Sequence, residues 1–535
     1  MINLSLDAII IADCGQHSLS GSSPLRLELD GWTADIQVIL NYLEHQGEVV
    51  LPIDGDGIMS WSSAPKLNGV FLHSYLTKHN FEVELIDNYV DERNVFRGLL
   101  EYSPRVVIIS TTFIYRKKDL RELIDDIRSL APHIFIIVGG PFVYLSYLIH
   151  ERSHEQIYKE EAIKDDFLFF NKDEPSADLF IISLRGEKIL CDALNRVKRD
   201  QQIDDLPNSA RFIGAEYHFT HQVDDISNAG NFFIDWKSLP DTIFKTGVVP
   251  MQASTGCPYK CAFCNFTKDR RLISIKPIEQ LVSELKAVSI RGAKYVWFAD
   301  DNFQLGSGDL NSVCQRFVDE GLKIRWMSFI RADSLKNVDF ELLRRSGCNE
   351  LRLGLESANP QILRNMNKKV DPTIAAEVVR ELLAVGINCS CYFVIGFPGE
   401  TDETVLRTIE FIKNIEYPNL EGILSWSLYP FMLAPMSPIY ESEMRKKYGL
   451  TGYMHNWEHR TMNSIEARGH VKKAFFALER SGPIYRGDNQ QKLLDLTPMK
   501  RRQFVAKRHE LSKLAVENRQ EKQNVIKSFT EVFSQ

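Results

Sequence analysis

The sequence predicts an α/β protein: an N-terminal doubly wound, Rossmann-like domain, then a partial (β/α)6 TIM-type barrel, and a C-terminal helical segment. Three observations lead to this prediction. The chain has 535 residues, enough for two to four domains at about 150 residues each. Its composition, 44% hydrophobic and 25% charged, is that of a globular protein. Short apolar runs alternate with helical patterns in two separate series, and this alternation is typical of parallel sheets.

The first series predicts the doubly wound domain, expected over residues 1–205. Its strand candidates are compact apolar runs, as expected of strands covered on both faces. They are residues 8–12, 82–86, 106–110, 134–138 and 179–182. Amphipathic helical stripes lie between them, and two stretches, the irregular 16–65 and the charge-rich 151–178, interrupt the series. Residues 206–246 have Asp, Asn, Gly and Pro punctuation and little periodicity, so they are expected to form a connector.

The second series predicts the barrel, expected over residues 247–432. Its strand candidates are residues 248–254, 295–298, 324–329, 350–354, 390–395 and 422–428, separated by helical stretches. Units of this spacing fit an open or partial barrel, whose functional groups lie at the carboxyl ends of the strands. Residues 433–535 are expected to form a C-terminal extension that is mostly helical, with a strong helical pattern from residue 493.

A cysteine cluster follows the first barrel strand directly. Cys257, Cys261 and Cys264 have the spacing C-x3-C-x2-C and are three of the nine cysteines. Thiolates on one loop can bind a soft metal centre, and three thiolates leave one iron of a four-iron cluster open. Structural zinc, a cluster closed by a distant cysteine and chance buried cysteines are the alternatives, although no second Cys/His pair follows at zinc-finger distance. The other six cysteines are expected to be buried and structural.

With these residues, the sequence resembles a radical S-adenosylmethionine (radical SAM) enzyme. The resemblance rests on the cysteine loop and on motifs that end successive barrel strands: FADDNF at 298–303, FIRAD at 329–333, LGLES at 353–357 and GFPGET at 396–401. It implies a [4Fe–4S] cluster held by the three cysteines, at which SAM is cleaved to a 5′-deoxyadenosyl radical. It also implies SAM contacts from Phe263, Asp300, Asp301, Arg331, Glu356, Ser357, Gly396, Pro398 and Gly399.

A doubly wound domain ahead of such a barrel resembles the cobalamin (B12)-binding radical SAM enzymes. That group includes the class B methyltransferases and the magnesium-protoporphyrin ester cyclase type. The resemblance implies cobalamin above the strand ends that carry Ser110, Thr111, Gly139, Gly140, Gly186 and Glu187. Small residues there let a ligand approach the backbone. The chain lacks the Asp-x-His-x-x-Gly signature, so that motif provides no axial histidine for cobalt.

Three function hypotheses follow. The first is a cobalamin-dependent methyltransferase that acts on an unactivated carbon or a phosphinate phosphorus. The second is a radical cyclase or rearrangement enzyme with cobalamin redox-active or absent. The third is a metal-stapled protein that binds nucleic acid through a basic C-terminal helix, but the net charge of −7 provides no global field for nucleic acid. The expected partners are a small-molecule or peptide substrate and an electron donor such as flavodoxin or ferredoxin.

Further candidates lie outside these motifs. His459, in the segment 457–462, is a candidate proton handler in a substrate lid, and a core histidine is the alternative. Tyr115, Arg116, Tyr144 and Tyr147 are candidates for lining the ligand face of the N-terminal domain. The uncharged run 134–149 is shorter than the roughly 18 residues of a membrane helix, and Gly-Gly-Pro breaks it, so a strand end and loop are expected. Without a signal or membrane segment, a cytoplasmic location with reduced thiols is expected.

Overall fold

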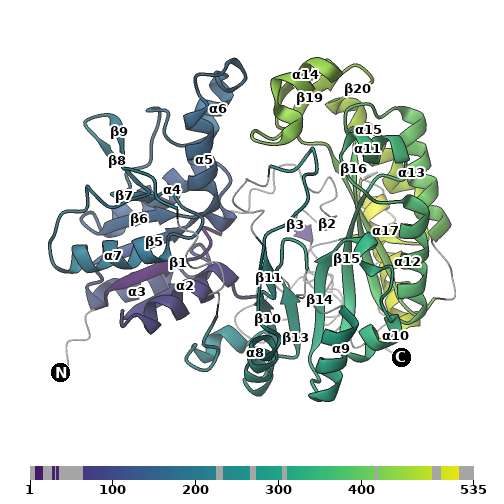
Figure 1. Ribbon diagram of the computed structural model, residues 1–535, viewed down its shortest axis with the longest axis horizontal. Helices are drawn as coiled ribbons and strands as arrows, with labels where there is room; N and C mark the ends of the chain where they lie inside the picture. Colours follow the sequence, from purple (N-terminus) through teal and green to yellow (C-terminus); the bar gives the residue numbers. More distant parts are fainter. Residues whose placement is uncertain are drawn as a thin grey trace. The chain divides into compact units, whose positions relative to one another are not determined.

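The computed structural model describes residues 6–15, 27–29, 32–34, 64–224, 233–265, 273–303, 310–415, 420–484 and 496–516. The chain forms two compact units. The N-terminal unit comprises Met1–Ser18, Pro65–Pro240 and Thr267–Arg270, and the barrel unit comprises Leu19–Ala64, Asp241–Phe266 and Arg271–Gln535. Each unit contains a parallel sheet with helices (Figure 1), which confirms the predicted fold class. No helix among the described residues is long and apolar enough to cross a membrane.

The N-terminal unit is built on one twisted sheet with the order β4-β1-β5-β6-β7-β8-β9. Its five parallel strands are β1 (Ala8–Ile11), β4 (Val83–Ile86), β5 (Val106–Ser110), β6 (Phe135–Gly139) and β7 (Leu179–Ile181). Numbered along the chain, these five have the order 2-1-3-4-5, which is a doubly wound order. The direction of winding reverses between β1 and β5, where sheets of this kind bind their ligands.

Helices cover both faces of this sheet. The crossovers from β1 and from β5 run in opposite directions across the sheet, and right-handed crossovers then place their helices on opposite faces. α2 (Leu67–Lys78) and α7 (Glu187–Lys198) pack together in one apolar core with the strands. α4 (Lys117–Leu130) and α5 (Pro141–Glu151) follow β5 and β6. The residues of β1 are fully buried, as the centre of such a sheet requires.

Two local predictions for this unit were wrong. Part of the expected connector forms a hairpin of β8 (Ser209–Ile213) and β9 (Glu216–Phe219), which extends the sheet in antiparallel fashion. Its turn is made by Gly214 and Ala215, both with positive φ, and the exposed edge lacks the apolar periodicity of a buried strand. The run 134–149 is β6 followed by a helix, α5, and not by a loop, because Pro141 takes the first helical position after Gly140.

The barrel unit has the strand order β10-β13-β14-β15-β16-β17-β21, with all of its pairs parallel. The six predicted strands are β10 (Val248–Met251), β13 (Tyr295–Phe298), β14 (Arg325–Ile330), β15 (Cys348–Glu356), β16 (Asn388–Ile395) and β17 (Leu424–Pro430). The short β21 (Gly482–Pro483) adds to the β17 edge. Within the described residues β10 and β21 do not pair, so the barrel is open, as predicted.

Helices cover the outer face of the barrel strands (Figure 1). They include α8 (Ile278–Ile290), α9 (Leu310–Asp319), α12 (Pro372–Ala384), α13 (Asp402–Ile415) and α15 (Ser464–Ala477). Outward-facing residues such as Leu351 and Leu353 are fully buried beneath them. The predicted C-terminal helix is present as α17 (Pro498–Val516), and the rest of that prediction lies outside the described residues.

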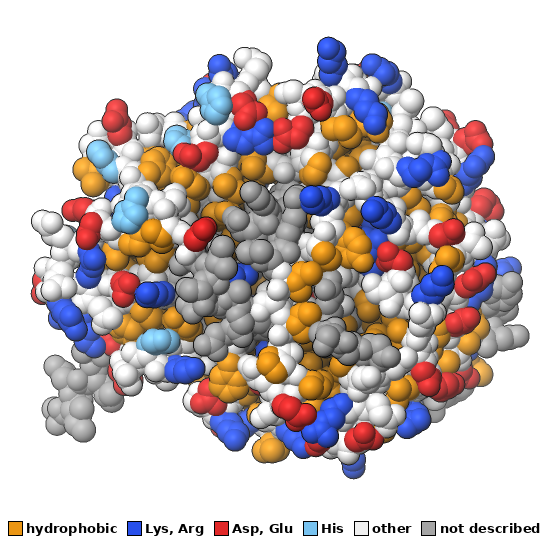
Figure 2. Space-filling view, viewed as in Figure 1, with side chains coloured by type: hydrophobic (Ala, Val, Ile, Leu, Met, Phe, Trp, Pro, Cys, Tyr) orange, Lys and Arg blue, Asp and Glu red, His pale blue; other side chains and the backbone are white. Residues whose placement is uncertain are grey.

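Charged side chains of both signs are interspersed on the surface. On the face shown in Figure 2, acidic and basic groups alternate, and no broad basic area is visible among the described residues. This distribution agrees with the small net charge of −7. The described residues on this face therefore form no basic patch of the kind that accompanies nucleic-acid binding.

Candidate functional site

The cysteine loop lies between β11 (Ser254–Thr255) and β12 (Ser274–Ile275), above the first barrel strand. Cys257, Cys261 and Cys264 are partly buried and form no disulfide. Among the described residues, no three His, Cys, Asp or Glu side chains converge tightly enough to hold a single ion. A [4Fe–4S] cluster does not need that convergence, because each thiolate binds a different iron. The three thiols therefore fit a cluster that keeps one iron open.

Two aspartates that follow β13 accept hydrogen bonds from residues at the start of this loop. Asp300 is 4% exposed and accepts hydrogen bonds from Ser254 Oγ at 2.6 Å, from the backbone N–H of Ser254 and from Ala253 N at 3.2 Å. Burial raises the pKa of Asp300 to about 7, although these donors oppose the shift. Asp301 accepts from Gly256 N at 3.0 Å. Asp300 was predicted to contact SAM, but its bonds favour a role in positioning the loop.

Aromatic contacts also join the loop to residues that follow two other barrel strands. The Arg331 guanidinium lies 3.7 Å from the Tyr259 ring centroid and forms an ion pair with Asp333 at 2.8 Å. On the other side, the Phe263 ring meets Phe397 edge-on, with centroids 6.4 Å apart. The predicted SAM residues Arg331 and Phe263 therefore both lie at the cysteine loop.

The end of β15 carries the next predicted residues. Glu356 is 8% exposed, and its carboxylate accepts a hydrogen bond from Lys368 Nζ at 2.8 Å. Ser357 is also buried, and its Oγ accepts from Asn359 N at 3.1 Å, so it helps to start the next helix. The strand pairing is irregular at this point, between Gly354 and Glu356. Lys368 was not among the predicted residues, and only its place in the fold brings it to this site.

The turn of the GFPGET motif follows β16. Gly396 has φ +90° and Gly399 has φ +96°, so both adopt the left-handed region that favours glycine. Gly396 N donates to the buried Glu400 carboxylate, whose pKa burial raises to about 8. Asn365 Nδ2 donates to Pro398 O at 3.1 Å. The turn predicted to contact SAM is thus held by one carboxylate and one amide side chain.

His459 lies in a small antiparallel sheet, not in an exposed lid. It belongs to β19 (Asn456–His459) and is 5% exposed, with its ring stacked on Trp457 at a centroid distance of 5.2 Å. Its Nε2 lies 3.0 Å from Gly396 O, and Thr461 N donates to Nδ1 at 3.3 Å. A carbonyl can only accept, so the neutral ring donates from Nε2, and burial lowers the pKa of His459. Both nitrogens are used within the fold, which favours a role in positioning the Gly396 turn.

The residues predicted to bind cobalamin lie at the carboxyl ends of the parallel strands of the N-terminal sheet. Ser110 and Thr111 end β5, Gly139 ends β6, and Gly140 has φ +111°. A Cβ on Gly140 would lie 3.0 Å from Thr111 Oγ1, so a larger residue would crowd this edge. Gly186 caps α7 at its N-terminus, and Glu187 is the first residue of that helix. The three glycines thus pack closely against the Thr111 and Ile181 side chains, and at these positions the ends of the strands carry no side chain of their own.

The four other candidates in this unit divide between exposed and packed positions. Tyr115 is 67% exposed directly after the β5 end. Arg116 pairs with Asp119 at 2.7 Å at the start of α4. Tyr144 and Tyr147 lie on α5, and Tyr147 packs against Phe219 with a centroid distance of 5.7 Å. Tyr147 thus contacts the β8–β9 hairpin.

A polar group at the point where the sheet reverses was missed. Asn68 Nδ2 donates to Ala12 O at 2.9 Å and to Ser110 Oγ at 2.8 Å, and so bridges β1 and β5. Lys66 lies beside it, 3.5 Å from Asp87 and 3.9 Å from Asp13. Asn68 and Lys66 follow an irregular stretch of sequence, so no pattern predicted their role. Asp13 directly follows a predicted strand, and this position could have indicated the polar group.

Comparison with known proteins agrees with both halves of this arrangement. The model of the radical SAM superfamily matches residues 251–412, and the model of the B12 binding domain matches residues 62–159. The chain is 25% identical to an uncharacterized methyltransferase of Pyrococcus horikoshii over 66% of its own length and 74% of the relative's. It is 23% identical to the anaerobic magnesium-protoporphyrin IX monomethyl ester cyclase of Cereibacter sphaeroides over 74% of its length, but spans only 62% of that enzyme.

The fold is also similar to a solved structure. The radical S-adenosylmethionine methyltransferase TsrM from Kitasatospora setae, solved with cobalamin and a [4Fe–4S] cluster bound, has a TM-score of 0.55 at 14% identity. The similarity covers 83% of this chain and 78% of that one. The two domain matches imply SAM, a [4Fe–4S] cluster and cobalamin as cofactors. The chain therefore combines a radical SAM domain, matched over residues 251–412, with a B12-binding domain, matched over residues 62–159.

Proposed function

We propose that the protein is a cobalamin-dependent radical SAM methyltransferase that acts on an unactivated carbon or a phosphinate phosphorus. The observation that carries the proposal is the combination of a three-cysteine loop on an open barrel with a doubly wound sheet that has a switch point between β1 and β5. The 25% identity to the Pyrococcus horikoshii methyltransferase supports methyl transfer as the outcome.

Cys257, Cys261 and Cys264 would hold the cluster, which, when bound, supplies the electron that cleaves SAM. Asp300 fastens the loop to the barrel through Ser254 and Ala253. Asp301, Arg331, Glu356, Ser357 and the turn from Gly396 to Gly399 surround the loop and would bind SAM. Helices pack on the outer side of the strands, and this support would help to hold the residues at the mouth of the barrel in a fixed geometry.

In the N-terminal unit, cobalamin would lie above Ser110, Thr111, Gly139, Gly140, Gly186 and Glu187. The glycines leave the sheet edge without side chains, and Asn68 ties β1 to β5 below it. Cobalamin would carry the methyl group, one SAM supplying it and a second SAM the radical. Since the Asp-x-His-x-x-Gly signature is absent, we infer that cobalt takes no histidine from that motif.

A second candidate is a cyclisation or rearrangement that uses the same radical. The similarity to the ester cyclase, which covers 74% of this chain, favours it specifically. In that case cobalamin would be redox-active or absent. The substrate would be a small molecule or a peptide, and an electron donor such as flavodoxin or ferredoxin would reduce the cluster.

One experiment separates these proposals. The full-length protein is purified without oxygen, reconstituted with iron and sulfide, and supplied with SAM, dithionite and hydroxocobalamin. Methyl transfer predicts bound corrin together with 5′-deoxyadenosine and S-adenosylhomocysteine as products. Deoxyadenosine without bound corrin or S-adenosylhomocysteine would favour the second candidate. No deoxyadenosine at all would contradict both.

A further inference from the structure

A buried ion pair beside the cysteine loop joins Glu356, one of the proposed SAM residues, to Lys368, which has no role in the proposed function. Lys368 Nζ lies 2.8 Å from Glu356 Oε1, and the two side chains are only 8% and 10% exposed. Removing two charges from water carries a desolvation cost that their attraction offsets only in good geometry. A pair buried at a strand end, next to a metal-binding loop, therefore calls for a reason beyond stability.

The backbone around this pair is shaped to accommodate it. A Cβ on Gly354 would lie 2.6 Å from Glu356 Oε1 and 3.1 Å from Lys368 Nζ, so a side chain at that position would displace the pair. Glu356 itself has φ +64°, a left-handed conformation that costs a non-glycine residue roughly 1–3 kcal/mol. Such strain persists where the surrounding structure enforces it, and it concentrates at functional sites.

The turn that carries Lys368 is tied to both neighbours of Cys261. Ala262 N donates to Met366 O at 2.8 Å. Asn367 Nδ2 donates to Lys260 O at 2.7 Å. These two bonds hold the Lys368 segment against the backbone on both sides of Cys261. Lys368 and Arg331 lie close enough for their positive charges to act on the Cys261 side chain, and Glu356 acts on it in the opposite sense.

We propose that Lys368 is a positioning residue that holds a fixed positive charge against the Cys261 side of the cluster and so favours its reduction. One-electron reduction adds one negative charge to the cluster, makes and breaks no bond in the protein, and draws its electron from an external donor. A nearby cation stabilises the reduced form, and a nearby carboxylate destabilises it. Glu356 fixes the lysine in place and offsets part of its effect.

The inference rests on the proposed role of the three cysteines as cluster ligands, and not on methyl transfer. It is tested on the full-length, anaerobically reconstituted protein without SAM. The midpoint potential of the cluster is measured by titration with dithionite and redox mediators, followed by the electron paramagnetic resonance signal of the reduced cluster. Iron and sulfide content are determined for every sample.

A double-mutant cycle gives the expected result. Lys368→Met shifts the midpoint potential to more negative values, Glu356→Gln shifts it to more positive values, and the double variant lies between them. Lys368→Arg keeps the charge and stays close to wild type. The control is Lys286→Met, which should leave the potential unchanged. Lys286 is a surface residue of the outer helix α8 and pairs with Glu320.

The contrary outcomes are equally clear. Full cluster content with an unshifted potential in Lys368→Met overturns the inference. If that variant fails to retain its cluster, Glu356→Gln carries the test, and an unshifted potential there overturns the inference as well. Wild-type protein that assembles no cluster would instead overturn the cysteine assignment itself.

Discussion

At the scale of single residues, the three cysteines differ sharply from the other six. Cys389 and Cys391 are fully buried on a barrel strand, and burial raises their thiol pKa values. Cys257, Cys261 and Cys264 are partly exposed on one loop. Thiolates bind iron and buried neutral thiols do not, so this contrast separates ligand cysteines from core cysteines.

Cys261→Ala should therefore abolish SAM cleavage and leave the fold intact. The side chain lies on a loop fixed by its neighbours' backbone bonds, which alanine keeps. Cleavage is measured as 5′-deoxyadenosine formed, and the fold by circular dichroism. The matched control is Cys391→Ala, which should lower stability but retain cleavage by the folded fraction. Retained cleavage in Cys261→Ala would contradict the assignment.

Glu400 should make the stability of the barrel unit depend on pH. Burial raises its pKa from 4.5 to about 8, and its Oε1 has no hydrogen-bond partner among the described residues. The folded state thus holds the proton more tightly than the unfolded state. The resulting stabilisation is complete below pH 4.5 and is lost progressively as the pH rises to about 8.

Glu400→Gln tests this contribution. Glutamine cannot ionise, and its side-chain oxygen can still accept from Gly396 N. The variant should lose less Tm than wild type between pH 6 and pH 8.5, as measured by thermal unfolding followed by circular dichroism. An equal loss of Tm in the two proteins would contradict the prediction.

Local spacing explains which site residues could be predicted. The cysteine loop and each strand-end motif are short continuous stretches of sequence, so their chemistry can be predicted without the fold. The hydrogen-bond partners of these residues cannot be predicted in this way. Lys368 meets Glu356 only because a helix intervenes and turns back, and His459 meets Gly396 from a separate sheet. Hydrogen-bond partners far apart in sequence are set by tertiary packing, which periodicity does not encode.

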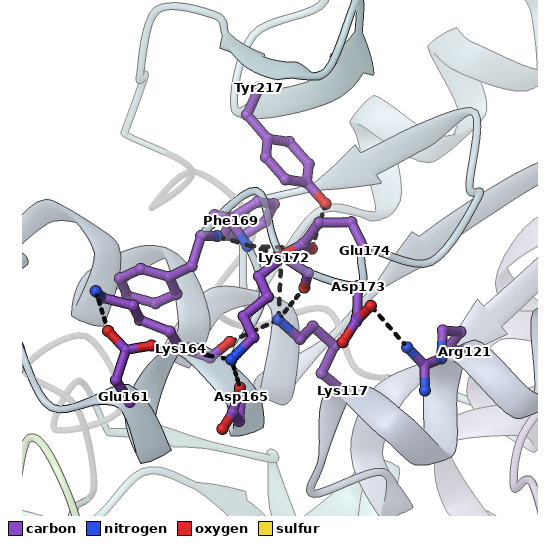
Figure 3. Close-up of polar contacts among 11 residues, drawn as sticks. Lys117, Arg121, Glu161, Lys164, Asp165, Phe169, Lys172, Asp173, Glu174 and Tyr217 are labelled. Atoms are coloured by element: carbon purple, nitrogen blue, oxygen red, sulfur yellow. Dashed lines mark hydrogen bonds and ion pairs between the residues drawn. The ribbon is translucent and has the colours of Figure 1, made fainter.

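At the scale of elements, the charge-rich stretch in the N-terminal unit is ordered by one buried lysine (Figure 3). Lys117, on α4, donates to the backbone oxygens of Lys164 and Lys172, both at 2.6 Å, and pairs with Glu174 at 3.3 Å. Glu174 also accepts from Tyr217 Oη at 2.6 Å, which ties the stretch to β9. The charge-rich sequence of residues 151–178 predicted an interruption of the strand–helix series. In the structure, the contacts of Lys117 and Glu174 attach this segment to α4 and β9.

Lys117→Met should destabilise the N-terminal unit by about 3–5 kcal/mol, because it leaves the Glu174 carboxylate buried without its cation. Lys117→Met combined with Glu174→Gln should recover part of this loss. Urea unfolding gives the free energies, and limited proteolysis reports whether residues 151–178 become accessible to cleavage. A single variant as stable as wild type would show that the pair contributes nothing.

In the N-terminal sheet, the parallel strands were predicted from the sequence and the antiparallel hairpin was missed. The five parallel strands of the N-terminal sheet are mainly apolar, although β4 carries the exposed Glu84, and all five were predicted within two residues of their bounds. The β8–β9 hairpin lies at the sheet edge, where exposed polar residues interrupt the pattern. Edge strands take their place from a neighbour's backbone, and so their own sequence indicates them weakly.

At the scale of the whole molecule, the B12-binding match and the sheet do not begin at the same residue. The family match starts at residue 62, but β1, at Ala8–Ile11, lies in the middle of the sheet between β4 and β5. Among the described residues that follow β1, the strands β2 (Leu27–Leu29) and β3 (Trp32–Ala34) and Ala64 belong to the barrel unit, and the chain returns to the N-terminal unit at Pro65. The first strand of one unit is thus followed in sequence by part of the other.

A chain that begins at residue 62 should therefore fail to form the N-terminal unit, although it keeps the whole family match. It would leave β4 and β5 without the strand that joins them. Solubility, circular dichroism and thermal unfolding report the result. Full-length Ile10→Asp, which places a charge at a fully buried position of β1, should fail in the same way. Cooperative unfolding of both variants at the wild-type temperature would contradict the prediction.

The interleaved order of the two units also bears on how the chain folds during synthesis. β1 leaves the ribosome before β4 and β5, and it has no partner strand until these two have been made. Its four fully buried residues must stay unpaired during that interval. Pairings between distant segments are slow, and exposed apolar strands invite aggregation. Production of this protein should accordingly depend on translation speed and on chaperones that shield its first strand.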